Sequence, residues 1–217
     1  MEIEGQRSKK EKMTYDRTTA PASDFITAAE AAFNVAGDPT YDATKLTRDI
    51  KASIRAAEHY CRRAFINQTW TYKMDKFPTV NKLNPTASIY VPFGKMQSLT
   101  DDIITYIDTD GTSVELEKDT DFYLDTSGHV ARLYPIVSWP SAVSTTRPSP
   151  ISFSAVMGEG SSLPDDMADV KDACLLWLGD MYELRQTRTP VQTYDTRLFH
   201  QLLHPYKIYF DFSINDL

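Results

Sequence analysis

The sequence lacks the residue patterns that mark the common catalytic and cofactor sites. Its 2 cysteines form no CxxC pair, and its 8 glycines form neither a GxGxxG nor a Walker-type phosphate loop. The 4 histidines are scattered, and none stands in a recognisable motif with a serine or cysteine nucleophile. We therefore predict that the protein is not an enzyme, and we assign no catalytic residue, no metal ligand and no cofactor.

The chain also lacks a long apolar run and an excess of positive charge. No stretch approaches the roughly 20 apolar residues that span a bilayer, and residues 1–12 hold no signal-peptide core, so we expect no membrane contact. The 30 acidic and 23 basic side chains give a formal net charge of −7. Because phosphate contacts need lysine and arginine, this balance disfavours the gripping of nucleic acid as the main role and leaves only a local basic patch open.

The remaining composition predicts one good core. Hydrophobic residues make up 41% of the 217 residues, which is ordinary for a globular protein and enough for one core with arms. Cys61 and Cys174 each fall on the apolar face of an expected helix. We expect both to be buried free thiols in a reducing compartment, rather than partners in a disulfide.

Periodicity and capping signals predict helices over residues 28–35, 41–65 and 164–186. Thr27 and Glu30 have the spacing of a capping box at the start of the first. The second has an apolar stripe at spacings of three and four, formed by Leu46, Ile50, Ile54, Ala57, Cys61 and Phe65. The third carries a similar seam, formed by Met167, Val170, Cys174, Trp177, Met181 and Leu184. We expect this seam to pack on the second helix of the same chain, with a neighbouring subunit as the alternative.

Residues 68–158 read as β-structure. Short runs that alternate bulky and polar residues predict strands over 68–75, 88–91, 99–108, 113–117, 122–125, 130–134 and 151–157. Asp110-Gly111 is a strong hairpin signal, because glycine accepts a positive φ, and it explains Asp108–Gly111 better than a calcium loop does. Hairpins at this spacing favour an antiparallel meander. The predicted fold class is α+β, with two long amphipathic helices packed on a small antiparallel β-meander.

Two arms flank the predicted core of residues 24–186. Residues 1–23 are polar and charged, so we expect a flexible N-terminal arm, or one that orders on a neighbouring subunit or touches DNA. Residues 187–217 form the predicted C-terminal arm, with a short helix over 195–203. Residues 206–212 then alternate polar with aromatic or apolar side chains, and such a segment pairs with its own domain or with a partner.

The order of these parts resembles the head–tail connector (adaptor) proteins of tailed bacteriophages. The resemblance covers about residues 25–206 and rests on seven short pieces in register. They are Ala64–Trp70 at the helix-to-strand junction, Pro92 with Leu99, the Asp108–Gly111 hairpin, Asp121–Asp125, Trp139-Pro140, the helix that begins at Pro164-Asp165-Asp166, and Leu202–Tyr206. The basic N-terminal arm, the loop over 138–150 and the aromatic tail are longer than the resemblance predicts.

The resemblance implies a virion protein of the neck, assembled in the host cytoplasm. Connector proteins of this kind form a homo-oligomeric ring, here of about twelve copies, that docks under the portal protein and carries the next tail or neck protein. DNA then passes through the lumen of the ring without specific binding. A net charge of −7 suits such a channel, because like charges repel and leave no adhesive sites.

Two sets of contact residues follow from the resemblance and from the extra segments. We expect the C-terminal segment to dock on the portal or on a neighbouring subunit through Tyr206, Ile208, Tyr209, Phe210 and Phe212. We expect the loop over 138–150 to meet the next tail component through Trp139 and Arg147.

Two other functions stay open. A neck stopper or tail-terminator protein would be mostly β, and the two long predicted helices argue against it. A small phage hydrolase or nuclease would need convergent carboxylates or a histidine–nucleophile pair in one pocket.

Overall fold

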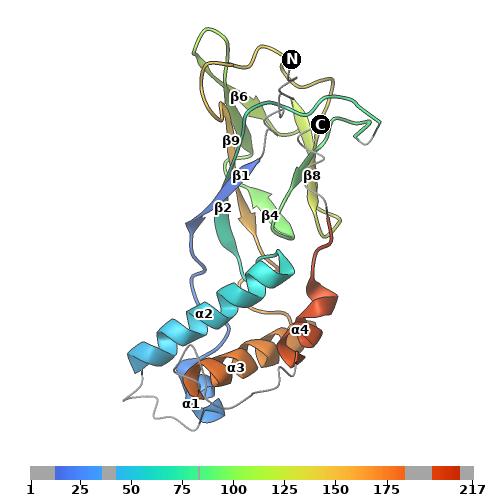
Figure 1. Cartoon of the computed structure of the whole chain (residues 1–217). Helices are drawn as coiled ribbons and strands as arrows, with labels where there is room; N and C mark the ends of the chain where they lie inside the picture. The colour runs from blue at the N-terminus through green and yellow to red at the C-terminus, as the bar shows by residue number, and fades with distance from the viewer. Residues whose placement is uncertain (1–12, 36–42, 83, 184–196, 211–217) are drawn as a thin grey trace, which may run out of the picture.

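The computed structural model describes residues 13–35, 43–82, 84–183 and 197–210. The helices gather at one end of the molecule and the antiparallel sheets form the other (Figure 1). Buried apolar side chains form one cluster within the sheets and another among the helices. The predicted α+β class is confirmed.

The helical end is built from α1 (Ala28–Asn34), α2 (Ala43–Cys61), α3 (Ala168–Glu183) and α4 (Leu198–Leu203). A short 3₁₀ turn, η1 (Asp165–Met167), leads into α3, and a second, η2 (His204–Tyr206), follows α4. Helix α4 ends at Leu203, as the helix expected over 195–203 does, and a 3₁₀ turn with Pro205 follows it. Proline fits there because it lies at the start of a new 3₁₀ turn, where its missing N–H breaks no helical hydrogen bond.

Helix α1 begins with the predicted capping box. The Thr27 Oγ1 accepts a hydrogen bond from the Glu30 N–H at 3.2 Å, and the Thr27 N–H donates to the Glu30 carboxylate at 2.8 Å. Lys171 of α3 donates to the same carboxylate. These bonds, that of Lys171 first, lower the pKa of Glu30 to about 2. The cap therefore also ties α1 to α3.

Helices α2 and α3 pack against each other within the chain, as the seam of the third helix predicts. Leu46, Ala57 and Cys61 of α2 are fully buried with Val170 and Cys174 of α3. The Cys174 thiol donates to the Ser53 carbonyl of α2 at 3.8 Å. At Trp177 the seam shifts by one residue, because Leu178 is the side chain that is fully buried.

Helix α2 is shorter than predicted. It ends at Cys61, and Arg62 takes a left-handed conformation with φ of 55°. Ala64 and Phe65 are nevertheless fully buried. Because these two residues continue the apolar spacing, the predicted helix ran on to residue 65. In the structure the chain has already left the helix at Arg62 and turned toward the sheet. Phe65 still packs in the cluster of the helices.

The larger sheet has six strands among the described residues. Their spatial order is β1 (Thr14–Thr19), β2 (Gln68–Met74), β9 (Ile151–Met157), β5 (Ile103–Ile107) and β6 (Ser113–Glu117), and β4 (Met96–Leu99) also pairs with β9. All of these pairs are antiparallel. The predicted meander is wrong, because the last strand along the chain lies at the centre of the sheet.

A smaller antiparallel sheet stands beside the first. It has the order β3 (Ile89–Val91), β8 (Ala131–Pro135) and β7 (Phe122–Asp125). Ile89, Leu133 and Phe122 are fully buried in the same cluster as the larger sheet. Between β5 and β6, the Gly111 N–H donates to the Asp108 carbonyl at 3.1 Å and Gly111 has φ of 85°, so the predicted hairpin is confirmed.

Part of the predicted flexible N-terminal arm is a strand. β1 pairs antiparallel with β2, with Thr14 opposite Lys73 and Tyr15 opposite Tyr72. The Thr18 and Thr71 hydroxyls share a hydrogen bond of 2.6 Å across the pair. The expectation of a flexible arm over 1–23 is thus corrected for residues 14–19, whose polar side chains suit an exposed edge strand. Residues 1–12 lie outside the described part.

Candidate functional site

A buried ion pair joins the helical end to the sheets. Arg63 lies just after α2, and its guanidinium bonds to the carboxylate of Glu159, which lies just after β9. The two side chains are 6% and 10% exposed. Lys95 approaches the other carboxylate oxygen at 3.6 Å. Burial disfavours the charged guanidinium and so lowers the pKa of Arg63 from its ordinary value. Because a buried charge is costly without a counter-charge, the Arg63 guanidinium depends on the Glu159 carboxylate beside it.

The backbones at this junction come unusually close. Gly158 has φ of 139°, and a Cβ there would lie 2.5 Å from the carbonyl carbon of Ile66. Gly94 has φ of 100°, and a Cβ there would lie 2.8 Å from the Cβ of Arg63. Only glycine fits both the backbone conformation and the space. The junction between the helices and the sheets is therefore tightly packed.

A second set of polar contacts, between Glu58, Gln68 and Arg17, also connects the helices to the larger sheet. Glu58 of α2 accepts a hydrogen bond from the Gln68 Nε2 at 2.6 Å, and the Gln68 Oε1 accepts one from Arg17 of β1 at 3.1 Å. Burial raises the pKa of Glu58 despite this bond. The link connects helix α2, strand β2 and the N-terminal strand β1.

The C-terminal segment begins on the chain's own core. The Tyr206 hydroxyl donates to the Asp166 carbonyl at 3.1 Å, and the Ile208 N–H donates to the Cys61 carbonyl at 2.9 Å. Ile208 is 7% exposed, whereas Tyr209 is 67% exposed. The Phe210 ring lies against Tyr90 of β3, with ring centres 4.8 Å apart.

The structure therefore separates the five residues expected to dock on a partner. Tyr206 and Ile208 bind the chain's own helices, and Phe210 lies on the small sheet. Tyr209 turns outward, although its hydroxyl also shares a hydrogen bond with His204 at 2.9 Å. Phe212 lies outside the described residues. Residues 207–210 form no β-ladder, so the alternation marks sides of an extended segment and not a strand.

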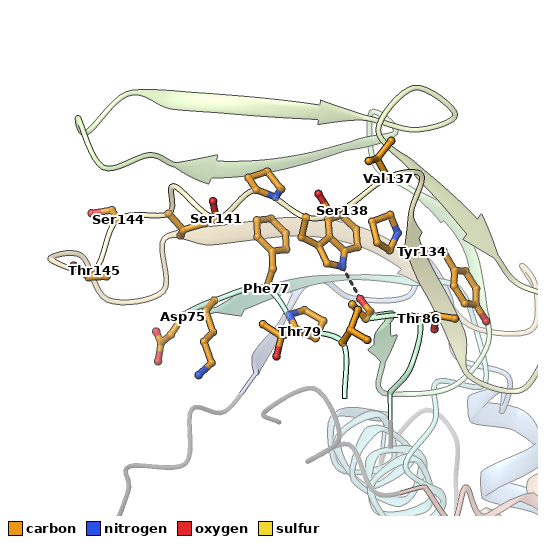
Figure 2. A pocket seen from close by; sticks show the side chains of 18 of the residues that line it. Asp75, Phe77, Thr79, Thr86, Tyr134, Val137, Ser138, Ser141, Ser144 and Thr145 are labelled. Carbon is orange, nitrogen blue, oxygen red and sulfur yellow. Dashed lines mark hydrogen bonds between the residues drawn. The ribbon is translucent and has the colours of Figure 1, made fainter. Parts of the chain in front are cut away.

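The loop over 138–150 closes one side of a groove of about 1180 Å³. Trp139 lies half-buried in it, stacked on Phe77 with ring centres 4.9 Å apart and planes 5° apart. Its indole N–H donates to the Ala87 carbonyl at 2.6 Å, the dashed line in Figure 2. Of the two residues expected to meet a tail component, Trp139 is thus anchored within the chain, and Arg147 is exposed.

Figure 2 shows Phe77 on the segment from Asp75 to Thr86, with its ring pointing toward the loop from Val137 to Thr145. Val80 and Val137 line it and are 73% and 91% exposed. An apolar hollow with exposed apolar side chains is typical of a site that another chain segment covers.

Acidic side chains concentrate on β5, β6, β7 and their turns. Asp108, Asp121 and Asp125 accept backbone hydrogen bonds within the turns. A further six acidic residues are exposed, with Lys118 as the basic residue among them: Asp101, Asp102, Asp110, Glu115, Glu117 and Asp119. This surface carries the sign of charge that repels phosphate.

The described residues offer little reactive chemistry. They contain no group of three or more metal-ligating side chains, and no helix among them is long and apolar enough to cross a membrane. His200 and His204 stand four residues apart, a spacing that ligates metals in other proteins, but no third ligand joins them in the part of the chain described. Burial raises the pKa of Cys61 to about 12 and that of Cys174 still higher, so neither thiol is an activated nucleophile.

Sequence reasoning missed the Arg63–Glu159 pair and the groove. Both join residues that are far apart along the chain, and periodicity reports only on neighbours. Gly158 is the residue that could have indicated the tightly packed junction, since a glycine directly after a buried strand often marks a close approach of two backbones.

Solved structures share this arrangement over nearly their whole length. A chain in the virion of a native gene transfer agent (GTA) particle matches with a TM-score of 0.68 and 16% identity, covering 91% of this chain and 96% of that chain. A chain in the neck of the native GTA particle, computed with C12 symmetry, gives a TM-score of 0.67 at 16% identity, with 91% and 97% covered.

A chain in the neck of the empty GTA particle, computed with C6 symmetry, gives a TM-score of 0.66 at 15% identity, again with 91% and 97% covered. At these identities the likeness shows a common fold. No protein-family model and no curated protein matches the sequence.

Proposed function

We propose that this protein is a structural component of a virion neck, and more closely the head–tail connector (adaptor) that forms a ring under the portal. The observation that carries the proposal is the fold match to chains of the GTA neck, which covers 91% of this chain and 97% of each of theirs. The motif resemblance to connector proteins of tailed bacteriophages supports it independently. A protein of this kind works through its surfaces and catalyses no reaction.

The proposed assembly is a ring of about twelve copies. The C12 and C6 symmetries with which the GTA necks were computed support a cyclic arrangement. A cyclic ring needs a heterologous contact, in which one surface of each subunit meets a different surface of the next. The exposed edges of the larger sheet, β1 and β6, and the outer faces of the helices offer such surfaces.

The C-terminal arm is the proposed contact with the portal or with a neighbouring subunit. Tyr206 and Ile208 fix the start of the arm on the chain's own helices. Tyr209 and the residues from Phe210 onward, including Phe212, then supply the contact. An aromatic segment on a fixed base loses less conformational entropy on docking than a free tail does.

The loop over 138–150 is the proposed contact with the next tail or neck protein. Trp139 holds the loop against Phe77, and Arg147 is exposed near it. DNA would pass through the lumen without specific binding. The acidic surface of β5, β6 and β7 supports a repulsive channel wall, because it offers few cations to phosphate.

The connector is favoured over the two other functions by specific features. Helix α2 has 19 residues and α3 has 16, and together they make a helical layer that a mostly β neck stopper or tail terminator would lack. A hydrolase or nuclease would need converging carboxylates or a histidine beside a nucleophile. Among the described residues, both thiols are buried instead, and the acidic side chains are spread over exposed turns.

The experiment is native mass spectrometry and negative-stain microscopy of the purified protein, alone and mixed with the portal of the same virion. We expect rings, or monomers that form rings only on the portal. A protein that stays monomeric and leaves the portal bare would refute the connector assignment. Rings that bind a tail component and not the portal would favour the stopper or terminator.

A further inference from the structure

The groove beside Phe77 presents uncovered apolar surface. Phe77 and Trp139 form its floor, and Val80 and Val137 stand exposed at its sides. The volume of about 1180 Å³ is large enough for several side chains. Exposed apolar surface of this kind is costly in water, so a chain segment that covers it is stabilised.

The C-terminal arm leaves the described structure next to this groove. Phe210 lies on Tyr90 of β3, and Tyr90 is the register partner of Arg132 on β8. The Arg132 guanidinium donates to the Tyr134 hydroxyl at 3.3 Å, and Tyr134 lines the groove. Residues 211–217 follow directly. Extended, they reach about 23 Å, whereas one step from β3 to β8 and two residues along β8 to Tyr134 take about 11 Å.

The chemistry of this segment fits the groove. Residues 211–217 read DFSINDL, with apolar side chains at Phe212, Ile214 and Leu217 and acidic ones at Asp211 and Asp216. The apolar side chains match the floor of the groove, and the acidic ones suit its basic residues, Lys76 and Arg147.

The acidic residue of the groove is already engaged. The Asp75 carboxylate accepts hydrogen bonds from the N–H and the hydroxyl of Ser149, at 2.8 and 3.3 Å. Both bonds end on Oδ1, and they hold the carboxylate against the loop over 138–150. Lys76 and Arg147 outnumber Asp75 among the charged lining residues, so the groove lining keeps a net positive charge.

The N-terminal residues are the other segment close to the groove, and their chemistry fits less well. Strand β1 brings Thr14 opposite Lys73, only a few residues before the groove lining begins at Asp75. Residues 1–12 carry four basic and three acidic side chains, and their apolar Met1 and Ile3 lie at the far end. The part nearest β1 is therefore charged, whereas the groove floor is apolar.

We propose that residues 211–217 lie in the groove of their own chain, with Phe212 and Ile214 against Phe77, Trp139 and Val137. The groove stores the C-terminal arm in the unassembled subunit. If the arm docks on the portal, as the proposed function requires, the portal competes with the groove, and binding the portal uncovers Val137. The stored arm itself does not depend on that function.

Hydrogen exchange of the monomeric full chain tests the proposal from both sides. Phe212→Asp should speed the exchange of the groove segments 77–80 and 137–147 by about tenfold or more. Val137→Asp should speed the exchange of residues 211–217 to a similar degree, because the arm and the groove protect each other. Phe33→Asp is the matched control, since Phe33 of α1 is also 91% exposed but lies at the helical end. It should change neither segment.

Three results would overturn the proposal. Residues 211–217 exchanging at the rate of an unstructured peptide in the unmodified chain would exclude a stored arm. Faster groove exchange after deletion of residues 1–12, and not after Phe212→Asp, would assign the groove to the N-terminal segment. Protection that disappears on dilution would assign the groove to the arm of another copy. Ring formation on the portal is read separately by mass, so failure of the stored arm leaves the connector proposal standing.

Discussion

The guanidinium of Arg63 and the carboxylate of Glu159 form a buried ion pair where helix α2 and strand β9 both end. The guanidinium also donates to the Tyr206 carbonyl at 3.5 Å, and its Nε has no hydrogen-bond partner among the described residues. Glu159 is therefore the counter-charge bonded to this guanidinium in the described part of the chain. A lost partner would leave a charge buried at the junction of the helices and the sheets. The pair should therefore be sensitive to the loss of either partner.

Glu159→Ala should lower the free energy of unfolding by about 3 kcal/mol or more, because it leaves Arg63 buried without its counter-charge. Urea denaturation followed by circular dichroism measures the loss. Lys118→Ala is the control, since it removes a more exposed pair with Asp102 and should cost about 0.5 kcal/mol or less. Equal effects of the two substitutions would contradict the role given to the junction.

The stability of the α1 cap should depend on pH. The pKa of Glu30 is lowered from 4.5 to about 2 in the folded chain, so its carboxylate adds stability above pH 4.5 that is lost as the pH falls toward 2. Because Glu30 and Lys171 are partly exposed, solvent screening keeps the effect to about 1 kcal/mol. Denaturation at pH 6 and at pH 3 should show a smaller difference in Glu30→Gln than in the unmodified chain. An unchanged difference would count against the cap.

Shortening the C-terminal arm should separate its anchor from its contact. A chain ending at residue 210 keeps Tyr206 and Ile208 on the helices, so it should fold and lose only the stability that residues 211–217 supply in the groove. It should bind the portal at least about tenfold more weakly. A chain ending at residue 205 should lose stability as well, because the buried Ile208 goes with it. Portal binding and tail attachment measured on both chains decide this. Normal tail attachment by the chain ending at 205 would discard the proposed contact.

The loop over 138–150 should show two separable roles. Trp139→Ala should destabilise the chain by about 2 kcal/mol or more, because it removes the ring stacked on Phe77 and the bond to Ala87. Arg147→Glu should leave stability unchanged and weaken attachment of the next tail component, since Arg147 is exposed. Unimpaired tail attachment by Arg147→Glu, or by a chain without the loop, would remove the loop from the proposed contacts.

Local signals in the sequence predicted local structure well. The capping box at Thr27 and Glu30 and the Asp108–Gly111 hairpin are both present, because each depends on groups within a few residues of one another. The apolar stripes of α2 and α3 also predicted their mutual packing. Each of these features follows from the geometry of a single element.

Features that depend on distant partners were not predictable in the same way. β9 lies between β2 and β5 and pairs with both through its backbone. The residues of β9 alone do not identify these partner strands, because backbone pairing is the same for every residue type. Residues 14–19 read as a solvated arm because an edge strand and a loop have the same polar composition. The loop over 138–150 was expected to meet a partner through Trp139, whereas Trp139 stacks on Phe77 within the chain.

A cryo-EM map of the virion neck would show whether this chain forms the connector ring. We predict a closed ring of about twelve copies of this chain between the portal and the next tail protein, with the C-terminal arm on the portal or on a neighbouring subunit. The account would be contradicted by a map in which the neck lacks this chain. A solitary copy with acidic side chains converging on a bound metal ion would contradict it equally.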